Sequence, residues 1–192
     1  MDLIRLRGAV ENFANIWFPN DGSHVKFWFR ARDKKYSLTI TELCEKSFSP
    51  VDEITGLLPT AVLEELEGSG WSSTELVELA VLLDQMPRNA LAVNYGRYKG
   101  LDPRDVKGAV DDSFSLAFAL VLLERLKFPI TNDERLICFF SLVFRHSNDL
   151  DRAKMVLNTL RLSSGALPPL ASKFWAENEK RAEQSLSSTK PS

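Results

Sequence analysis

The stretch SSTELVELAVLLDQMPRN, residues 72–89, carries the clearest structural pattern in the chain. Ser72 and Glu75 have the spacing of a capping box, in which each side chain bonds the backbone N–H of the other residue at a helix start. Apolar residues then follow on every side of the expected helix, which is typical of a helix surrounded by protein. We therefore expect a buried helix to begin directly after Ser72.

Two further segments repeat this apolar pattern and complete the predicted core. One helix is expected at 111–127, where Pro129 stops it, and another begins at Thr131, which has capping-box spacing to Glu134. Weaker patterns predict helices at 8–18, 37–48, 59–67, 149–162 and 168–186, with loops at 19–23 and 94–105. Short connections favour antiparallel neighbours, so the sequence predicts an all-α fold, either a helical bundle or a layered superhelix of helix hairpins.

The composition is that of one globular domain, which we place at 1–186 with a disordered tail at 187–192. The 192 residues are 44% hydrophobic and 26% charged, and a chain of this length buries roughly 70% of its unfolded surface. The net charge of −2 is scattered, which argues against a nucleic-acid partner. No stretch reaches the about 18 apolar residues of a membrane span, and we expect no signal peptide. Cys44 and Cys138 lie far apart, so we predict reduced, packed thiols in a cytoplasmic protein.

Polar residues interrupt the apolar pattern at the end of the first core helix. Asp84 and Arg88 are four residues apart, so they share one helix face, which continues from apolar positions. Pro87 removes a backbone hydrogen bond and is expected to bend or end the helix there. A helix end lined by these charges and by the amides Gln85 and Asn89 can bind a polar ligand. The alternative is an ion pair between Asp84 and Arg88 that serves the fold alone.

His146 closes the third core helix and continues its apolar face, so we expect it to point inward. A carboxylate such as Asp149 or Asp151 could hold the imidazole in one tautomer, as a general acid or base requires. The alternative is a packed histidine beside the cap of the next helix. Trp28, in an early aromatic segment, is a candidate for the wall of a pocket, although large rings more often fill a core.

Motifs of greater catalytic specificity are missing from the sequence. There is no GxSxG nucleophile elbow, no glycine-rich phosphate loop and no HExxH zinc motif. Asp111 and Asp112 fall in the first turn of a predicted helix, where the helix dipole is a sufficient reason for negative charge. We therefore predict no metal and no nucleotide cofactor.

The string LLDQMPRN at 82–89 resembles the signature of an α-helical family known as domain of unknown function nine-twenty-four. The order of the other motifs is similar, with Trp17-Phe18 and Trp28-Phe29 early, DERL at 133–136 and RHSNDL at 145–150, over roughly 14–160 of the chain. The resemblance implies a tetratricopeptide-like α-superhelix and little about activity. Asn148 stands where the family usually has glutamate, and the closing RFPHRN-like motif is not found between 168 and 192.

Two functional hypotheses follow. As an enzyme, the domain would use His146 as acid or base, with Asp84 and Arg88 orienting a carbonyl or carboxylate of a small molecule, in a cyclisation, isomerisation, elimination or hydrolysis. Substrate contacts would come from the remaining candidate residues, Gln85, Asn89, Trp28 and Asp149. A place in secondary metabolism is compatible with this by family analogy. The alternative is a helical interaction module that binds a peptide or protein, and the oligomeric state is left open.

Overall fold

The computed structural model describes residues 1–21, 33–126 and 133–188 of the chain. Within these residues the chain forms helices and loops, with no β-strand, so the predicted all-α fold class is confirmed. The elements are α1 Leu3–Trp17, η1 Lys34–Tyr36, α2 Ser37–Ile54, α3 Pro59–Gly68, α4 Ser73–Ala92, η2 Gly96–Tyr98, α5 Val106–Ala109, α6 Ser113–Arg125, α7 Glu134–His146, α8 Leu150–Ser164 and α9 Pro169–Ser188. The last helix includes residues 187–188 of the predicted tail, and 189–192 lie outside the described residues.

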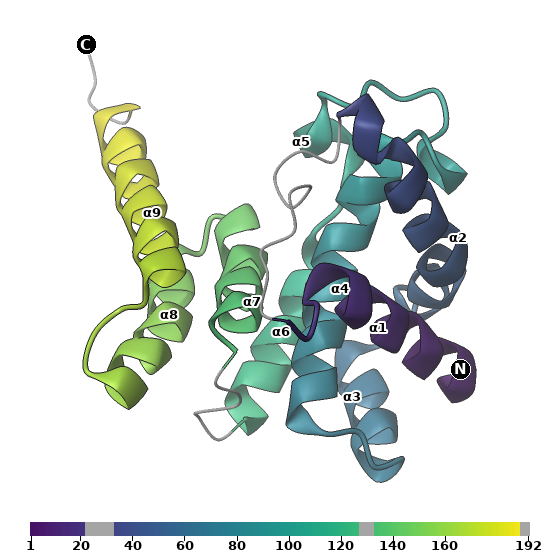
Figure 1. Cartoon of the computed structure of the whole chain (residues 1–192), viewed down its shortest axis with the longest axis horizontal. Helices are drawn as coiled ribbons and strands as arrows, with labels where there is room; N and C mark the ends of the chain where they lie inside the picture. Colours follow the sequence, from purple (N-terminus) through teal and green to yellow (C-terminus); the bar gives the residue numbers. More distant parts are fainter. Residues whose placement is uncertain (22–32, 127–132, 189–192) are drawn as a thin grey trace.

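Helix α4 lies at the centre of the fold, in contact with α1, α2, α6 and α7 (Figure 1). The predicted capping box starts it: the backbone N–H of Glu75 donates to Ser72 Oγ at 3.3 Å, and that of Ser72 donates to Glu75 Oε2 at 2.7 Å. Burial extends around the helix, as its apolar pattern predicted, and also takes in three polar residues near its end. The fold therefore encloses the segment that carries the candidate polar residues.

Pro87 does not end α4, contrary to the prediction that allowed the helix to stop there. The helix continues to Ala92, with Pro87 buried in its interior. An interior proline costs a helix about 3 kcal/mol because it removes one backbone hydrogen bond and crowds the preceding turn. The four helices packed around α4 offset this local cost, so Arg88 and Asn89 follow Asp84 on the same helix.

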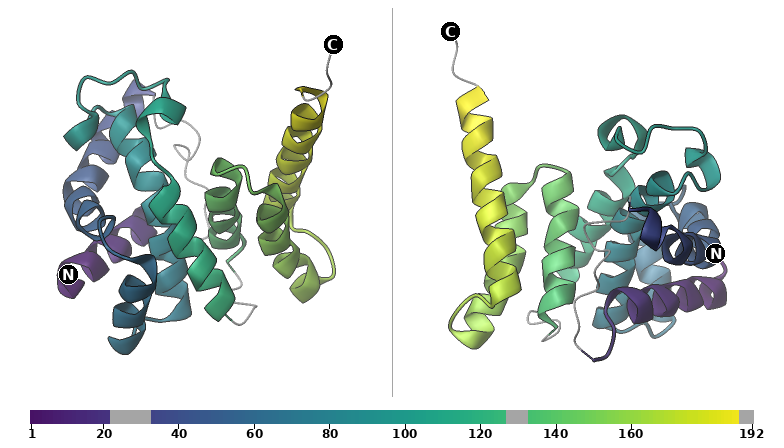
Figure 2. Two further views of the ribbon diagram at one scale, coloured as in Figure 1. Left: turned by 180° about the vertical axis from the view of Figure 1, so that it is seen from behind. Right: turned by 45° about the horizontal axis from the view of Figure 1, so that its top comes forward.

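Helices α7, α8 and α9 form a layer in which each helix contacts the other two. Figure 2 shows this layer on one side of the molecule and the group formed by α1–α6 on the other. Aromatic packing joins the two parts: the rings of Trp17 and Phe18 lie edge-on to Phe139 of α7, at centroid distances of 5.9 and 5.7 Å. The early aromatic pair thus belongs to the core, as expected for large rings.

Several helices are longer than their patterns predicted. Helix α1 begins at Leu3, five residues before the predicted start at Gly8, because the side chain of Asp2 caps it by accepting from the N–H of Arg5 at 3.0 Å. Helix α2 passes through Pro50 and continues to Ile54, beyond the predicted end at 48. Both differences extend helices that were predicted and add no new element.

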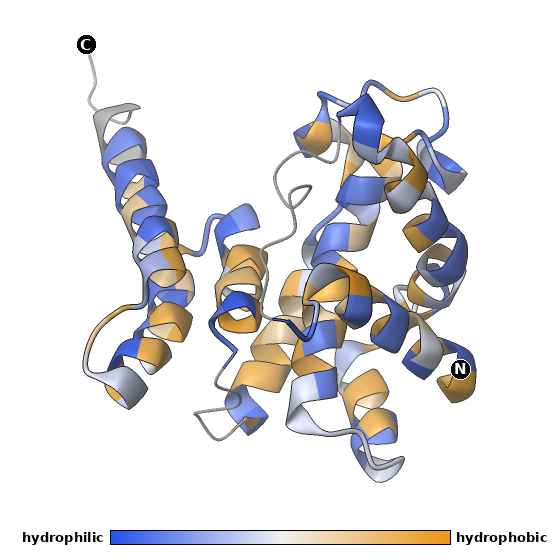
Figure 3. Cartoon of the chain, in the orientation of Figure 1, coloured by the Kyte–Doolittle hydropathy of each residue, from blue (hydrophilic) through white to orange (hydrophobic). Residues whose placement is uncertain are grey.

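The second core helix is less buried than expected, whereas the third is buried as expected but begins after Asp133. Helix α6 buries only one side, and apolar residues such as Leu116 and Leu120 stay partly exposed, although Figure 3 shows hydrophobic residues along most of its length. Helix α7 is more deeply buried, and its N-cap is Asp133, whose carboxylate accepts from the N–H of Arg135 at 2.9 Å. The predicted cap, Thr131, lies outside the described residues.

Candidate functional site

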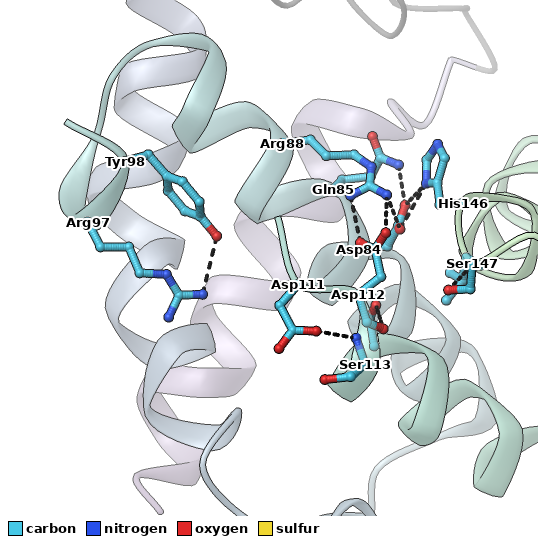
Figure 4. A network of polar contacts seen from close by, with 12 residues as sticks. Asp84, Gln85, Arg88, Arg97, Tyr98, Asp111, Asp112, Ser113, His146 and Ser147 are labelled. Carbon is cyan, nitrogen blue, oxygen red and sulfur yellow. Dashed lines mark hydrogen bonds and ion pairs between the residues drawn. The ribbon is translucent and has the colours of Figure 1, made fainter. Parts of the chain in front are cut away.

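The carboxylate of Asp84 lies in the middle of a buried polar network (Figure 4). Asp84 is 1% exposed. His146 Nδ1 lies 2.9 Å from each of its two carboxylate oxygens, and Gln85 Nε2 donates to Oδ2 at 2.6 Å. Arg88 adds an ion pair from the next turn of α4, with Nη2 3.6 Å from Oδ1. Three side chains from two helices therefore converge on one carboxylate.

These contacts keep Asp84 ionised in spite of its burial. Burial by itself raises the pKa of this carboxyl, because a charge is poorly solvated inside a protein. The electrostatic effects of His146 and Arg88, with hydrogen bonds from His146 and Gln85, outweigh that effect and bring the pKa below its ordinary value. Asp84 is therefore a buried anion that can accept a hydrogen bond from the imidazole.

His146 is the last residue of α7, and its two ring nitrogens have different surroundings. Because Asp84 is an anion, Nδ1 carries the hydrogen and donates it to the carboxylate. The other nitrogen, Nε2, points away from Asp84 in Figure 4 and has no partner among the described residues. The side chain is 20% exposed, so this nitrogen is not sealed in the core. We call this pair the Asp84–His146 dyad.

Arg88 extends the network from α4 to the start of α6. Its Nη1 and Nη2 atoms each donate at 2.8 Å to one oxygen of Asp112, which is a bidentate pair. Burial lowers the pKa of Arg88, but Asp84 and Asp112 raise it above its ordinary value overall. Arg88 therefore lies between two carboxylates, and its terminal nitrogens are taken up by protein contacts.

Asp112 is the member of this network that sequence reasoning did not single out as a site residue. The helix dipole was thought sufficient to explain its charge, but its side chain makes no cap hydrogen bond and binds Arg88 instead. The two residues are 24 positions apart, and no sequence pattern signals such a contact. An acid beside a helix start is too common to have distinguished it.

The two amides of the candidate set have different surroundings. Gln85 is bound to Asp84, so it orients the carboxylate of the dyad. Asn89 is 2% exposed, and its Nδ2 has no hydrogen-bond partner among residues 1–21, 33–126 and 133–188. A buried amide donor without a partner is uncommon in proteins. Within the described residues, neither amide side chain hydrogen-bonds to His146.

Asp149 lies apart from the dyad. It is the N-cap of α8, where its carboxylate accepts from the N–H of Arg152 at 3.2 Å and from Nη1 of the same residue at 2.6 Å. The carboxylate that holds His146 therefore comes from α4, 62 positions away, and not from the residues that directly follow the histidine. Trp28, the predicted pocket wall, lies outside the described residues.

The sequence-based hypothesis required the two polar sets to meet at a common cavity. They do meet, at 2.9 Å, but the cavity found nearby opens on the neighbouring face of α4. That cavity is lined on α4 by Leu83 and Pro87, each one residue before a charged member of the network. The structure thus brings together Asp84, Arg88, Gln85 and His146, and it places the cavity beside them.

Three findings concern the other chemistry predicted from the sequence. Cys44 and Cys138 are free and buried, and burial raises the pKa of both thiols, that of Cys44 to about 12. In the part of the chain that the structure describes, no group of three or more His, Cys, Asp and Glu side chains is arranged to hold a metal ion. Within the same ranges, no helix combines the length and the apolar character needed to cross a membrane.

The chain was also compared with known proteins. No family model, no curated protein and no solved structure matches it.

Proposed function

We propose that this domain is an enzyme that performs acid/base chemistry on a small polar molecule, with Nε2 of His146 as the atom that takes up and returns the proton. The observation that carries the proposal is the pair of 2.9 Å contacts between His146 Nδ1 and the carboxylate of Asp84. A carboxylate on one nitrogen fixes the tautomer, so the other nitrogen has the lone pair that a general base needs.

Each neighbour of the dyad has a role in this proposal. When Nε2 accepts a proton from the substrate, the imidazolium that forms is stabilised by the buried negative charge of Asp84. Gln85 and Arg88 hold that carboxylate ionised and in place. Arg88 acts through Asp84, because its terminal nitrogens already bind Asp112. Asn89 offers a further buried donor.

Proton transfer of this kind serves a cyclisation, isomerisation, elimination or hydrolysis of a compound with a carbonyl or carboxylate group. These reactions need no nucleotide cofactor, and the proposal includes none and no metal. The cytoplasmic location, the place in secondary metabolism and the resemblance to the family suggested by the LLDQMPRN string remain predictions.

The experiment follows proton exchange and turnover in the full chain. The protein is incubated in deuterated water with a panel of small carbonyl and carboxylate compounds, and NMR and mass spectrometry report conversion or deuterium uptake. We expect at least one compound to react, and His146→Gln to slow it by roughly 10²–10⁴-fold, the usual contribution of a general acid or base. The matched control is His24→Gln, the same change at the other histidine of the chain, which should keep the activity.

Two results would contradict the enzyme proposal. One is a panel in which no compound exchanges or reacts, and the other is equal turnover in the wild type and in His146→Gln. Melting curves of both variants separate loss of chemistry from loss of fold.

One observation favours the second candidate, a helical interaction module. The chain of contacts from His146 through Asp84 and Arg88 to Asp112 joins α7, α4 and α6, and each charge in it has a partner. Such a network can brace helices without catalysis. In that case His146→Gln would lower stability, and no member of the panel would react.

A further inference from the structure

A cavity of about 230 Å³ lies between α4, the start of α6 and the turn η2. Its apolar wall includes Leu83 and Pro87 of α4 and Phe114 of α6. Pockets for drug-sized ligands usually measure about 300–1,000 Å³. The cavity therefore suits a smaller molecule, of about the size of an amino acid.

Two opposite charges line this cavity from different elements. Arg97 comes from η2, and Asp111 comes from the residues just before α6. Figure 4 shows their charged ends turned toward one another. Arg97 and Asp111, both among the described residues, do not form an ion pair with each other. Arg97 Nη1 pairs with Asp52 at 2.7 Å, and one oxygen of Asp111 accepts from the N–H of Ser113 at 2.9 Å. Each side chain therefore keeps hydrogen-bonding capacity toward the cavity.

Both groups are held in position by the chain around them. Arg97 Nη2 donates to the hydroxyl of Tyr98 at 3.2 Å, and its guanidinium lies 5.3 Å from the centroid of that ring. The preceding residue, Gly96, has a φ of +56° and fits closely against Phe48, where a Cβ would lie 2.6 Å from Cε1. The backbone hydrogen bond from Ser113 holds the pKa of Asp111 below its ordinary value, so this side chain is an anion.

We propose that this cavity binds a short zwitterion of amino-acid size, whose ammonium group pairs with Asp111 and whose carboxylate pairs with Arg97. A ligand with a single charge would pair with only one of the two wall charges. A neutral ligand would use neither charge. A molecule that carries both charges satisfies both walls, and the apolar side of the cavity takes its methylene groups.

This site is separate from the proposed acid/base function. Arg97 and Asp111 are not part of the Asp84–His146 dyad, and the cavity is lined by other residues of α4. Either proposal can therefore fail while the other stands. His146→Gln should leave zwitterion binding unchanged.

The test titrates the full chain with glycine, β-alanine and 4-aminobutanoate, three zwitterions that differ in charge separation, and follows the backbone amides by NMR. We expect at least one zwitterion to shift the amides of Ala109, Ser113 and Ser115 saturably at millimolar concentration. Butylamine and butyrate, which carry one charge each, should bind at least about tenfold more weakly.

Three variants locate the binding. Arg97→Gln and Asp111→Asn should each weaken the binding of the best-binding zwitterion by about tenfold or more, since each substitution removes one charge pair with the ligand. The matched control is Arg104→Gln, because Arg104 lies on the same connection, pairs with Asp102 and does not line the cavity.

Three results would overturn the proposal. The first is that no zwitterion shifts the amides saturably. The second is that butylamine or butyrate binds as tightly as the best zwitterion. The third is that Arg97→Gln and Asp111→Asn both bind that zwitterion as tightly as the wild type does. The comparison of zwitterions with single-charge compounds uses the wild-type chain, so it decides the question even where a variant fails to fold.

Discussion

Glu78 and Asp84 are two acids of α4, less than two turns apart, and burial raises the pKa of both. Asp84 is the more deeply buried, yet its pKa is below the ordinary value because His146, Arg88 and Gln85 surround it. Glu78 is partly exposed, and its pKa rises to about 7 through burial and through the negative charges of Glu75 and Asp133. Burial alone therefore does not set the ionisation of these two acids: the surrounding groups reverse its effect at Asp84, whereas at Glu78 burial is the main cause and the neighbouring negative charges add to it.

The largest difference between the two acids should appear when each is removed. Asp84→Ala removes the buried carboxylate that three donors share, one of them buried and two partly exposed, and loss of one partner from a buried charged network costs about 3–5 kcal/mol. Urea unfolding at neutral pH measures the change. Glu78→Ala is the matched control and should cost far less, since the side chain of Glu78 makes no hydrogen bond or ion pair with the described residues. A loss at Asp84 no greater than that at Glu78 would contradict the network.

Lowering the pH should remove the stabilising contribution of Asp84, whereas raising the pH should remove that of Glu78. The folded-state pKa of Asp84 is lowered, so its contribution to stability is present above the unfolded pKa of about 3.9 and is lost as pH falls through the folded value. We expect the free energy of unfolding of the wild type to fall more steeply below about pH 4 than that of Asp84→Asn. Parallel acid curves for the two proteins would show that the carboxylate is not stabilised in the fold.

Glu78 should lose its stabilising contribution as pH rises. Its folded-state pKa of about 7 is raised, so the contribution is complete below the unfolded pKa of about 4.3 and disappears as pH passes 7. Glu78→Gln keeps the shape and removes the charge, and we expect it to be more stable than the wild type at about pH 8 by about 1–2 kcal/mol, allowing for solvent screening. Chemical denaturation at both ends of this pH range checks it. Equal stabilities of the wild type and Glu78→Gln at about pH 8 would rule out a destabilising repulsion of Glu78 by Glu75 and Asp133.

The smallest effect is expected at the capped start of α4. Ser72→Ala removes the side-chain acceptor of the capping box and should cost about 1 kcal/mol in the free energy of unfolding. Ser73→Ala, one residue into the helix, is the control, and we expect it to be close to neutral. Thermal unfolding of both variants gives the comparison, which fails if the two substitutions cost the same.

Local sequence patterns predicted where the helices form better than they predicted which elements pack around each helix. The capping box and apolar run of α4 were read correctly, because both depend on residues close in sequence. The continuation of α4 past Pro87 was not, because the four helices that pack around α4 come from distant parts of the chain. Helix α6 is more apolar than α4, but fewer of the described elements pack against it, and the periodicity of a sequence does not report how many neighbours a helix has.

The sequence predicted individual residues of the site, but it did not predict which of them contact one another. Asp84 and His146 were each expected to face inward, and the structure joins them across 62 positions. The expected partners of His146 were the nearest acids in sequence, whereas the actual partner comes from another helix. The contact of Arg88 with Asp112 was missed for the same reason: which of several acids meets a given cation depends on how helices pack.

The bidentate contact of Arg88 also has a consequence for the identity of residue 88. Two terminal nitrogens in one plane hold both oxygens of Asp112, which fixes the angle of that carboxylate as well as its position. A lysine would bring the same charge on a single nitrogen, and the carboxylate could then rotate about one contact. Shape, and not charge alone, therefore accounts for an arginine at the point where α4 meets the first turn of α6.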